Sequence, residues 1–171
     1  MTGTGHDLTL RCAQPEDLEE VFALYRAAIR NLDQAGIPQW DEVYPDRATL
    51  TEDIRRGEMT LAFEQGRLAA VFTLNEEYDP DYQQAAWNWP DAPFLVLHRL
   101  CVHPDFQNRG VGRRTMAAME EAARSRGART IRLDAFTRNP HSLRMYEGLG
   151  YQKTGETQWR KGLFYLYEKK L

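Results

Sequence analysis

The stretch that decides the fold reads FLVLHRLCVHPDFQNRGVGRR and runs from Phe94 to Arg114. Its first nine residues are almost all apolar, which predicts a strand in the middle of a sheet over residues 94–102. The H-P-D that follows ends this strand, because proline cannot donate to the ladder. Strict alternation would put one set of its side chains on one face, namely Phe94, Val96, His98, Leu100 and Val102. The other face would then carry Leu95, Leu97, Arg99 and Cys101.

The turn after the strand has the character of an anion site. The run Q-N-R-G-V-G over residues 107–112 leads into a helix predicted over 110–126. Gly110 and Gly112 have no Cβ, so the backbone can adopt positive φ and come close to a ligand. The helix N-terminus offers unpaired N–H groups to an anion, and Arg109, Arg113 and Arg114 add positive charge nearby. The alternative is a turn that only lets a strand meet a helix. The run is neither a G-x-G-x-x-G fingerprint nor a loop that ends in G-K-[ST], which argues against a dinucleotide fold and a P-loop.

A second cluster of polar residues follows the strand predicted over residues 130–136. Asn139-Pro140 starts the next helix, where asparagine before proline makes a good N-cap. Tyr146 lies about two helical turns later, so one helix can present both side chains to a common ligand. The alternative for Tyr146 is a tyrosine packed at the edge of the core.

The order of these segments resembles the GNAT superfamily of N-acetyltransferases, most clearly over residues 97–155. Q-N-R-G-V-G matches that family's pyrophosphate signature, [QR]-x-x-G-x-[GA], and Asn139 and Tyr146 match its later asparagine and tyrosine. The resemblance implies one N-acetyltransferase domain over residues 1–171 with an α/β (α+β) fold. Its sheet would be mixed and mostly antiparallel, with about six to seven strands flanked by about four helices.

The resemblance also implies acetyl-CoA as co-substrate and assigns residues to it. Backbone amides of the glycine-rich turn would hold the pyrophosphate, and the edge of the 94–102 strand would pair with the pantetheine arm. The implied coenzyme site consists of Leu100, Cys101, Val102, Asn108, Arg109, Gly110, Val111, Gly112, Arg113, Asn139 and Tyr146. Tyr146 would act as the general acid that protonates the departing thiolate.

The base that deprotonates the acceptor amine has two candidates in the sequence. Asp134 lies at the end of a strand, where some related acetyltransferases place an acidic base. His98 lies in the middle of the 94–102 strand, and an ordinary histidine pKa of ~6.5 suits proton transfer at neutral pH. Either residue could instead be structural, and water could relay the proton without a unique base.

Two loops rich in aromatic and acidic residues are candidates for binding the acceptor. The first spans residues 37–45 and contains Trp40 and Tyr44, and the second spans 76–93, with a helical turn expected around 82–87. Aromatic faces beside carboxylates suit a cationic amine on a small molecule or peptide. The alternative is that these aromatic side chains close the core and the acids are solvated.

Composition narrows the remaining functional classes. With 171 residues, a net charge of −3 and a pI of about 5.8, the chain fits one domain that does not favour nucleic acid. The sequence contains neither an apolar run that could span a membrane nor a signal-peptide core, so we expect a cytoplasmic protein. Cys12 and Cys101 are expected to be buried thiols, and no metal is expected because the cysteines and histidines lack ligand spacing. A homodimer and a monomer both remain open.

Local patterns predict the other elements. Strands are expected over 8–13, 59–64, 68–75, 151–154 and 163–168, and helices over 15–35 and 47–56. Two other functions compete with the enzyme: a non-catalytic acyl-CoA-binding module, and a nucleotide-phosphate enzyme, which the missing P-loop lysine disfavours.

Overall fold

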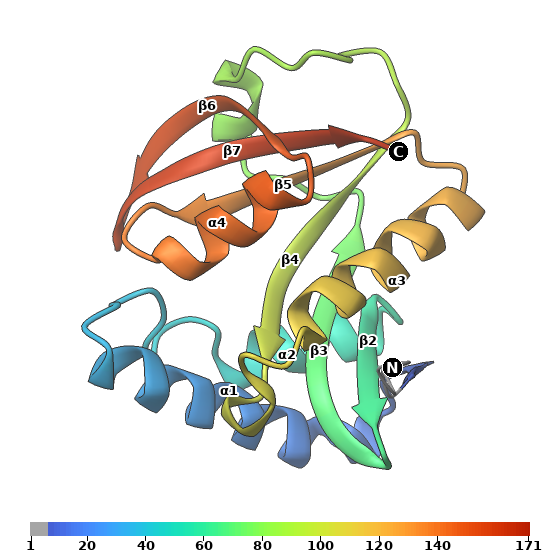
Figure 1. The fold of residues 1–171 in the computed structure, drawn as a ribbon, viewed down its shortest axis with the longest axis vertical. Coiled ribbons are helices and arrows are strands. Elements are labelled where there is room, and N and C mark those ends of the chain that lie inside the picture. Colours follow the sequence, from blue (N-terminus) through green and yellow to red (C-terminus); the bar gives the residue numbers. More distant parts are fainter. Residues whose placement is uncertain (1–6) are drawn as a thin grey trace, which may run out of the picture.

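The computed structural model describes residues 7–171, and this part of the chain forms one seven-stranded sheet flanked by four helices (Figure 1). The strand order is β1-β2-β3-β4-β5-β7-β6. Neighbouring strands are antiparallel except β4 and β5, which are parallel. The predicted fold class, a mixed and mostly antiparallel sheet with helices around it, is confirmed.

The bounds of the elements follow the local sequence signals closely. The strands are β1 Leu8–Cys12, β2 Met59–Glu64, β3 Arg67–Asn75, β4 Phe94–Val102, β5 Thr130–Phe136, β6 Gln152–Trp159 and β7 Gly162–Lys170. The helices are α1 Leu18–Gln34, α2 Arg47–Arg55, α3 Val111–Ser125 and α4 Pro140–Gly148. The long loop before β4 contains a 3₁₀ turn at Pro80–Gln84, slightly earlier than predicted.

The helices cover the sheet from both sides. Side chains of α3 and α4, such as Met116 and Tyr146, share a buried cluster with Leu95 and Leu97 of β4. Side chains of α1 and α2 form a second cluster on the opposite face, where Cys101 of β4 joins them. The central strand is therefore buried on both faces, as its apolar run predicted.

The sheet divides between β4 and β5, and this division creates the space for a site. Within residues 7–171 these two strands pair only from Phe94 to Val96 against Thr130 to Arg132. Beyond that point they diverge, so the C-terminal half of β4 has an edge that β5 does not cover (Figure 1). The glycine-rich turn and α3 follow directly from this edge.

A bulge at Arg99 overturns the predicted alternation of β4. Arg99 has a φ of 52°, and the register with β3 shifts between the pairs Thr73–His98 and Val71–Cys101. One extra residue in a strand reverses the faces of everything after it. His98 and Leu100 therefore lie on opposite faces, and the prediction that they share one was wrong.

Other expectations have mixed outcomes. The predicted cap of α2 is confirmed, because the Asp46 Oδ1 accepts a hydrogen bond of 2.9 Å from the Thr49 N–H. The strand predicted over 151–154 is longer, since β6 continues to Trp159. Cys101 is buried as expected, but Cys12 is exposed. Within residues 7–171 no helix is both long and apolar enough to cross a membrane.

Candidate functional site

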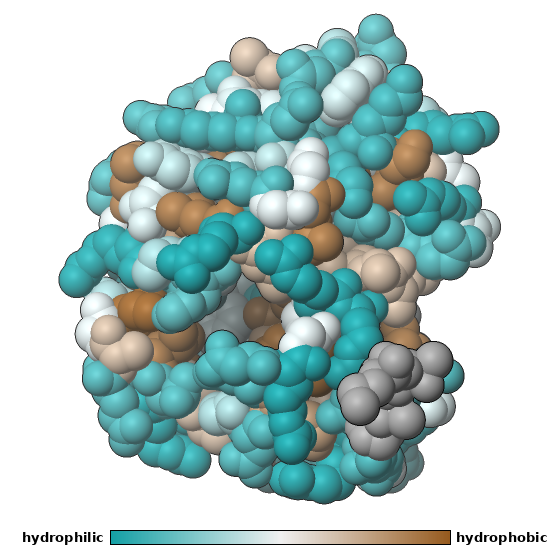
Figure 2. All heavy atoms as spheres, in the orientation of Figure 1, coloured by the Kyte–Doolittle hydropathy of each residue, from teal (hydrophilic) through white to brown (hydrophobic). Residues whose placement is uncertain are grey.

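Two cavities meet where β4 and β5 diverge. The first, about 490 Å³, lies between the C-terminal part of α1, the end of β4 and the starts of α3 and α4. The second, about 440 Å³, lies between β4, β5, the β6–β7 turn and the two aromatic loops. The surface is visibly hollowed between α1 and α4 (Figure 2). Both cavities share the lining residues Gln39, Trp40, Leu100, Ser142 and Tyr146.

The glycine-rich turn forms one wall of the first cavity. Gly110 is the N-cap of α3 with a φ of 76°, and Asn108 has a φ of 61°. A Cβ at Gly110 would meet no atom within 4 Å, so the backbone is open at this point. Val111, Gly112 and Arg113 of the first helical turn also line the cavity. Their N–H groups belong to the turn that lacks intrahelical acceptors, so this wall suits an anion.

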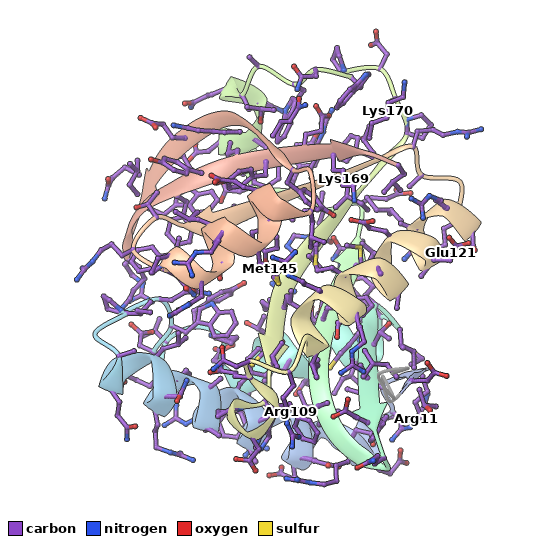
Figure 3. All side chains as sticks on the ribbon, viewed as in Figure 1. Arg11, Arg109, Glu121, Met145, Lys169 and Lys170 are labelled. Carbon is purple, nitrogen blue, oxygen red and sulfur yellow. The ribbon has the colours of Figure 1, made fainter. Side chains whose placement is uncertain are left out.

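Gly112 has a second role that the sequence did not reveal. A Cβ there would lie 3.0 Å from the Met145 Sδ and 3.7 Å from the Val102 Cγ2. Met145 projects from α4 toward α3 (Figure 3). The missing side chain therefore lets α3 pack closely against α4 at the edge of the cavity.

The arginines near the turn differ in where they point. Arg114 donates a 2.7 Å hydrogen bond to Glu64 on β2, and Arg109 lies 4.0 Å from the same carboxylate and over the Phe106 ring. Neither lines the first cavity, whereas Arg113 does. Arg109 is therefore the one predicted coenzyme residue that does not line the first cavity.

Tyr146 lies at the junction of the two cavities. It is buried, with 7% of its surface exposed, and packs against Tyr151 and Tyr167 with ring centroids 5.8 and 6.3 Å away. Burial raises the pKa of its hydroxyl well above the ordinary value. The group therefore keeps its proton at neutral pH and can donate it to either cavity.

Asn139 both caps α4 and faces the first cavity. Its Oδ1 accepts a 3.3 Å hydrogen bond from the Ser142 N–H, which confirms the predicted N-cap. Its Nδ2 donates to the Gln39 Oε1 at 2.8 Å and thereby ties α4 to the 37–45 loop. Asn139 and Tyr146 thus face the same space, as the two-turn spacing predicted.

The two candidate bases both line the second cavity. Asp134 is half-buried, and its Oδ2 accepts a 2.6 Å hydrogen bond from the Tyr82 hydroxyl. Burial raises the pKa of Asp134 to about 6. The carboxylate is therefore ionised at neutral pH but holds a proton more readily than an exposed aspartate does.

His98 is held as a hydrogen-bond donor. Its Nε2 lies 2.8 Å from the Asn75 Oδ1 and 3.0 Å from the Glu77 carbonyl oxygen. That Oδ1 also accepts from the Glu77 N–H, so it is an acceptor and the His98 Nε2 carries the proton. Burial lowers the pKa of His98 to about 4, which makes it neutral and weakly basic at pH 7.

Arg99 is the site residue that sequence reasoning missed. Its guanidinium donates to both oxygens of Asp53 at 2.8 and 2.7 Å and to the Tyr44 hydroxyl at 2.8 Å. The side chains of Arg99 and Asp53 are only 11% and 8% exposed. This ion pair fixes the bulge of β4 at the floor of the second cavity. An arginine inside an otherwise apolar strand was the available signal.

The first aromatic loop lies over the second cavity. Trp40 packs against Tyr25 with ring centroids 5.5 Å apart and lines both cavities, and Tyr44 lines the second. Asp41 does not face the cavity as a free acid, because Arg160 and Lys161 of the β6–β7 turn bind it at 2.8 and 3.1 Å. These contacts hold the loop across the second cavity.

The second aromatic loop contributes less than its composition indicated. Asp79 and Tyr82 line the second cavity. Trp87 instead packs over the Arg132 guanidinium at 4.2 Å, and Trp89 lies 5.9 Å from the Lys170 ammonium. These two tryptophans pack against cations of the sheet strands β5 and β7 and do not line either cavity. This agrees with the alternative that the aromatic side chains of the loop have a structural role.

Comparisons with known proteins agree with this architecture. A family model described as the acetyltransferase (GNAT) family matches residues 21–151. The S-(2-succino)cysteine N-acetyltransferase of Bacillus subtilis (strain 168) is 26% identical over 164 residues, which cover 94% of this chain and 93% of that protein.

Two solved structures have a similar fold. A GNAT-family acetyltransferase from Streptococcus agalactiae 2603 aligns with a TM-score of 0.86 at 22% identity, over 96% of this chain and 95% of that chain. The PaiA N-acetyltransferase of Thermoplasma acidophilum, solved in complex with coenzyme A, aligns with a TM-score of 0.72 at 18% identity, over 96% and 99%. At these identities the two structures support the fold alone.

Proposed function

Because the chain belongs to the acetyltransferase (GNAT) family and is an acetyltransferase, we propose that it transfers acetyl directly from acetyl-CoA to a primary amine. The observation that carries this proposal is the position of Tyr146, where a cavity walled by the glycine-rich turn meets a cavity lined by carboxylates. Tyr146 acts as the general acid. A donor and an acceptor that enter from the two sides would meet beside its hydroxyl.

The first cavity holds the coenzyme. The backbone N–H groups from Asn108 to Arg113 bind the pyrophosphate, for which the open backbone at Gly110 leaves room. The pantetheine arm lies along Leu100, Cys101 and Val102, where the edge of β4 is not covered by β5. A fold relative solved with coenzyme A supports this choice of ligand.

The second cavity holds the acceptor, a small amine that is charged when free. Asp79 and Asp134 favour a cation, and the faces of Trp40 and Tyr44 add to this attraction. The amine must become neutral before it attacks. Asp134, directly or through water, is a better proton acceptor than His98, whose pKa of about 4 makes it a weak base.

Transfer then takes place in one direct step. The amine nitrogen bonds to the thioester carbonyl carbon, and the carbon–sulfur bond breaks. The thiolate takes the proton of the Tyr146 hydroxyl, and the proton that the nitrogen loses on becoming an amide returns through water to the Tyr146 oxygen. The products are an acetylated amine and free coenzyme A. Positioning both reactants beside one acid accounts for most of the expected acceleration.

The test is thiol release from acetyl-CoA with a panel of primary amines, for the native protein and for Tyr146→Phe. Phenylalanine keeps the ring but removes the proton, so kcat should fall by about 10²-fold while coenzyme affinity changes little. Tyr167→Phe is the matched control, because Tyr167 belongs to the same aromatic cluster but lines neither cavity. An unchanged kcat in Tyr146→Phe under conditions where chemistry limits the rate would remove Tyr146 from this role.

A further inference from the structure

The β6–β7 turn brings two cations to the second cavity that the proposed chemistry does not use. Arg160 and Lys161 both line this cavity, and both contact the single carboxylate of Asp41. The Asp41 Oδ1 also accepts hydrogen bonds from the N–H groups of Val43 and Tyr44. Glu42, the other acid of that loop, is exposed and outside the cavity lining. The charge of Glu42 still acts on Arg160, but only Asp41 is bound directly by both cations.

Lys161 is the better placed of the two to bind a ligand. Its side chain is 23% exposed, against 53% for Arg160. An ammonium has three N–H donors, and the contact with Asp41 occupies one of them. The remaining donors can bind a second carboxylate that enters the cavity.

The opposite end of the cavity has the opposite charge. Asp79 and Asp134 lie there with Tyr82 and Tyr146. Between the two ends the wall is aromatic, with Phe164 5.2 Å from Phe136 and 4.9 Å from Trp159, measured between ring centroids. Arg99 also lines this cavity near Asp134, but Asp53 neutralises its charge. The second cavity therefore has carboxylates at one end, aromatic rings in the middle and the two cations of the β6–β7 turn at the other end.

The sheet register gives the distance between the two ends. Asp134 lies opposite Leu166, and Lys161 immediately precedes Gly162, the first residue of β7. The four steps from Gly162 to Leu166 span roughly 13 Å at ~3.3 Å per residue. This backbone separation is longer than a plain α-amino acid, and the side chains of Lys161 and Asp134 shorten the gap that a ligand must bridge.

We propose that the acceptor carries a carboxylate separated from its reacting amine by an apolar spacer. The carboxylate binds Lys161 and Arg160, the spacer lies against Phe136 and Phe164, and the amine reaches Asp134 and Tyr146. The ligand class is an ω-amino acid or an amino acid with a long carboxylate-bearing side chain. This inference rests on the proposed function and adds that the acceptor carries a carboxylate as well as the reacting amine.

The experiment compares ω-amino acids of increasing length, from 4-aminobutanoate through 6-aminohexanoate to 8-aminooctanoate, each with its neutral amide. Thiol release gives kcat/KM for each member of a pair. A charge-assisted contact should favour the carboxylate over its amide by roughly 10- to 100-fold at the best-fitting length, and less at shorter lengths. Ratios near one at every length would overturn the proposal.

Variants locate the contact. Lys161→Met should reduce the carboxylate-to-amide ratio toward one, mainly by raising KM for the carboxylate. Lys153→Met is the matched control, because Lys153 lies outside both cavities, bound to Glu156 at 2.8 Å, and this variant should keep the ratio. Asp41→Asn loosens the loop but retains both cations, so the ratio should persist. A ratio lost equally in Asp41→Asn and Lys161→Met would assign the effect to the loop and contradict the proposal.

Calorimetry separates this inference from the proposed function. Binding of 6-aminohexanoate and its amide to the coenzyme A complex needs no turnover, and the carboxylate should bind more tightly. If amides and carboxylates are acetylated equally well and bind equally, the proposed function stands and this inference fails. If the carboxylate binds more tightly but neither compound is acetylated, the proposed function fails while the binding site remains.

Discussion

The ion pair between Arg99 and Asp53 gives a prediction whose size follows from its burial. Asp53→Asn removes the negative charge but keeps an oxygen that can accept a hydrogen bond. The guanidinium of Arg99 would then be left 11% exposed without its counter-charge. Removing one partner of a buried pair costs about 3–5 kcal/mol, because the remaining charge has lost its water as well as its partner.

The matched control is Asp17→Asn. Asp17 also receives two hydrogen bonds from one arginine, at 2.7 and 2.8 Å, but that arginine, Arg11, is 46% exposed. Water replaces the lost partner there, so the expected cost is at most about 1 kcal/mol. The two pairs differ mainly in the exposure of the arginine, 46% for Arg11 against 11% for Arg99. Asp17 also accepts a 2.7 Å hydrogen bond from the Gln14 N–H, and the asparagine oxygen can keep this contact.

Thermal and urea unfolding measure both costs. For a chain of this length the larger cost corresponds to a fall in Tm of roughly 6–20 °C, and the smaller to a few degrees. Arg99→Met combined with Asp53→Leu should recover part of the loss, since no unpaired charge then remains. Equal losses in Asp53→Asn and Asp17→Asn would refute the reasoning that burial makes this pair important.

Three further predictions concern the site. Asp134→Asn should lower kcat and yet stabilise the protein above pH 6. Burial raises the pKa of Asp134 to about 6, so the ionised native carboxylate reduces the stability of the folded protein as the pH rises from ~4 through 6. Unfolding measured at pH 8 and pH 4 should show the variant more stable than the native protein by on the order of 2 kcal/mol at pH 8 alone. Gly112→Val should displace Met145 and weaken acetyl-CoA binding, measured by calorimetry. If adding Met145→Ala to this variant restores binding, the clash between α3 and α4 caused the loss. If binding stays weak, the added side chain blocks the pyrophosphate. Trp40→Ala should raise KM for cationic amines more than KM for acetyl-CoA, and equal changes would mean that its ring only packs against Tyr25.

The sequence predicted correctly those elements whose formation depends on residues close together in the chain. The apolar run of β4 and the Asn139 cap of α4 each depend on neighbouring residues, and both lie where the sequence placed them. Gly110 and Tyr146 line one cavity, in agreement with what the resemblance to the acetyltransferase family implied.

The parts that could not be predicted depend on contacts between distant segments. The bulge at Arg99 is held by Asp53, which is 46 residues away. Asp41 belongs to the 37–45 loop that was predicted to bind the acceptor, yet its partner Arg160 lies 119 residues further along the chain. Trp87 belongs to the 76–93 loop, the second one predicted to bind the acceptor, yet its ring packs against the Arg132 guanidinium instead. In each case a partner that no local pattern reveals decides the role of the side chain.

A structure of the protein with bound coenzyme A tests the central claim most directly. The account predicts the pyrophosphate on the N–H groups of residues 108–113, the pantetheine beside Leu100 to Val102, and the thiol within hydrogen-bond reach of the Tyr146 hydroxyl. The thiol should also point toward the second cavity. A coenzyme whose sulfur lies away from Tyr146, or whose pyrophosphate binds elsewhere, would contradict it.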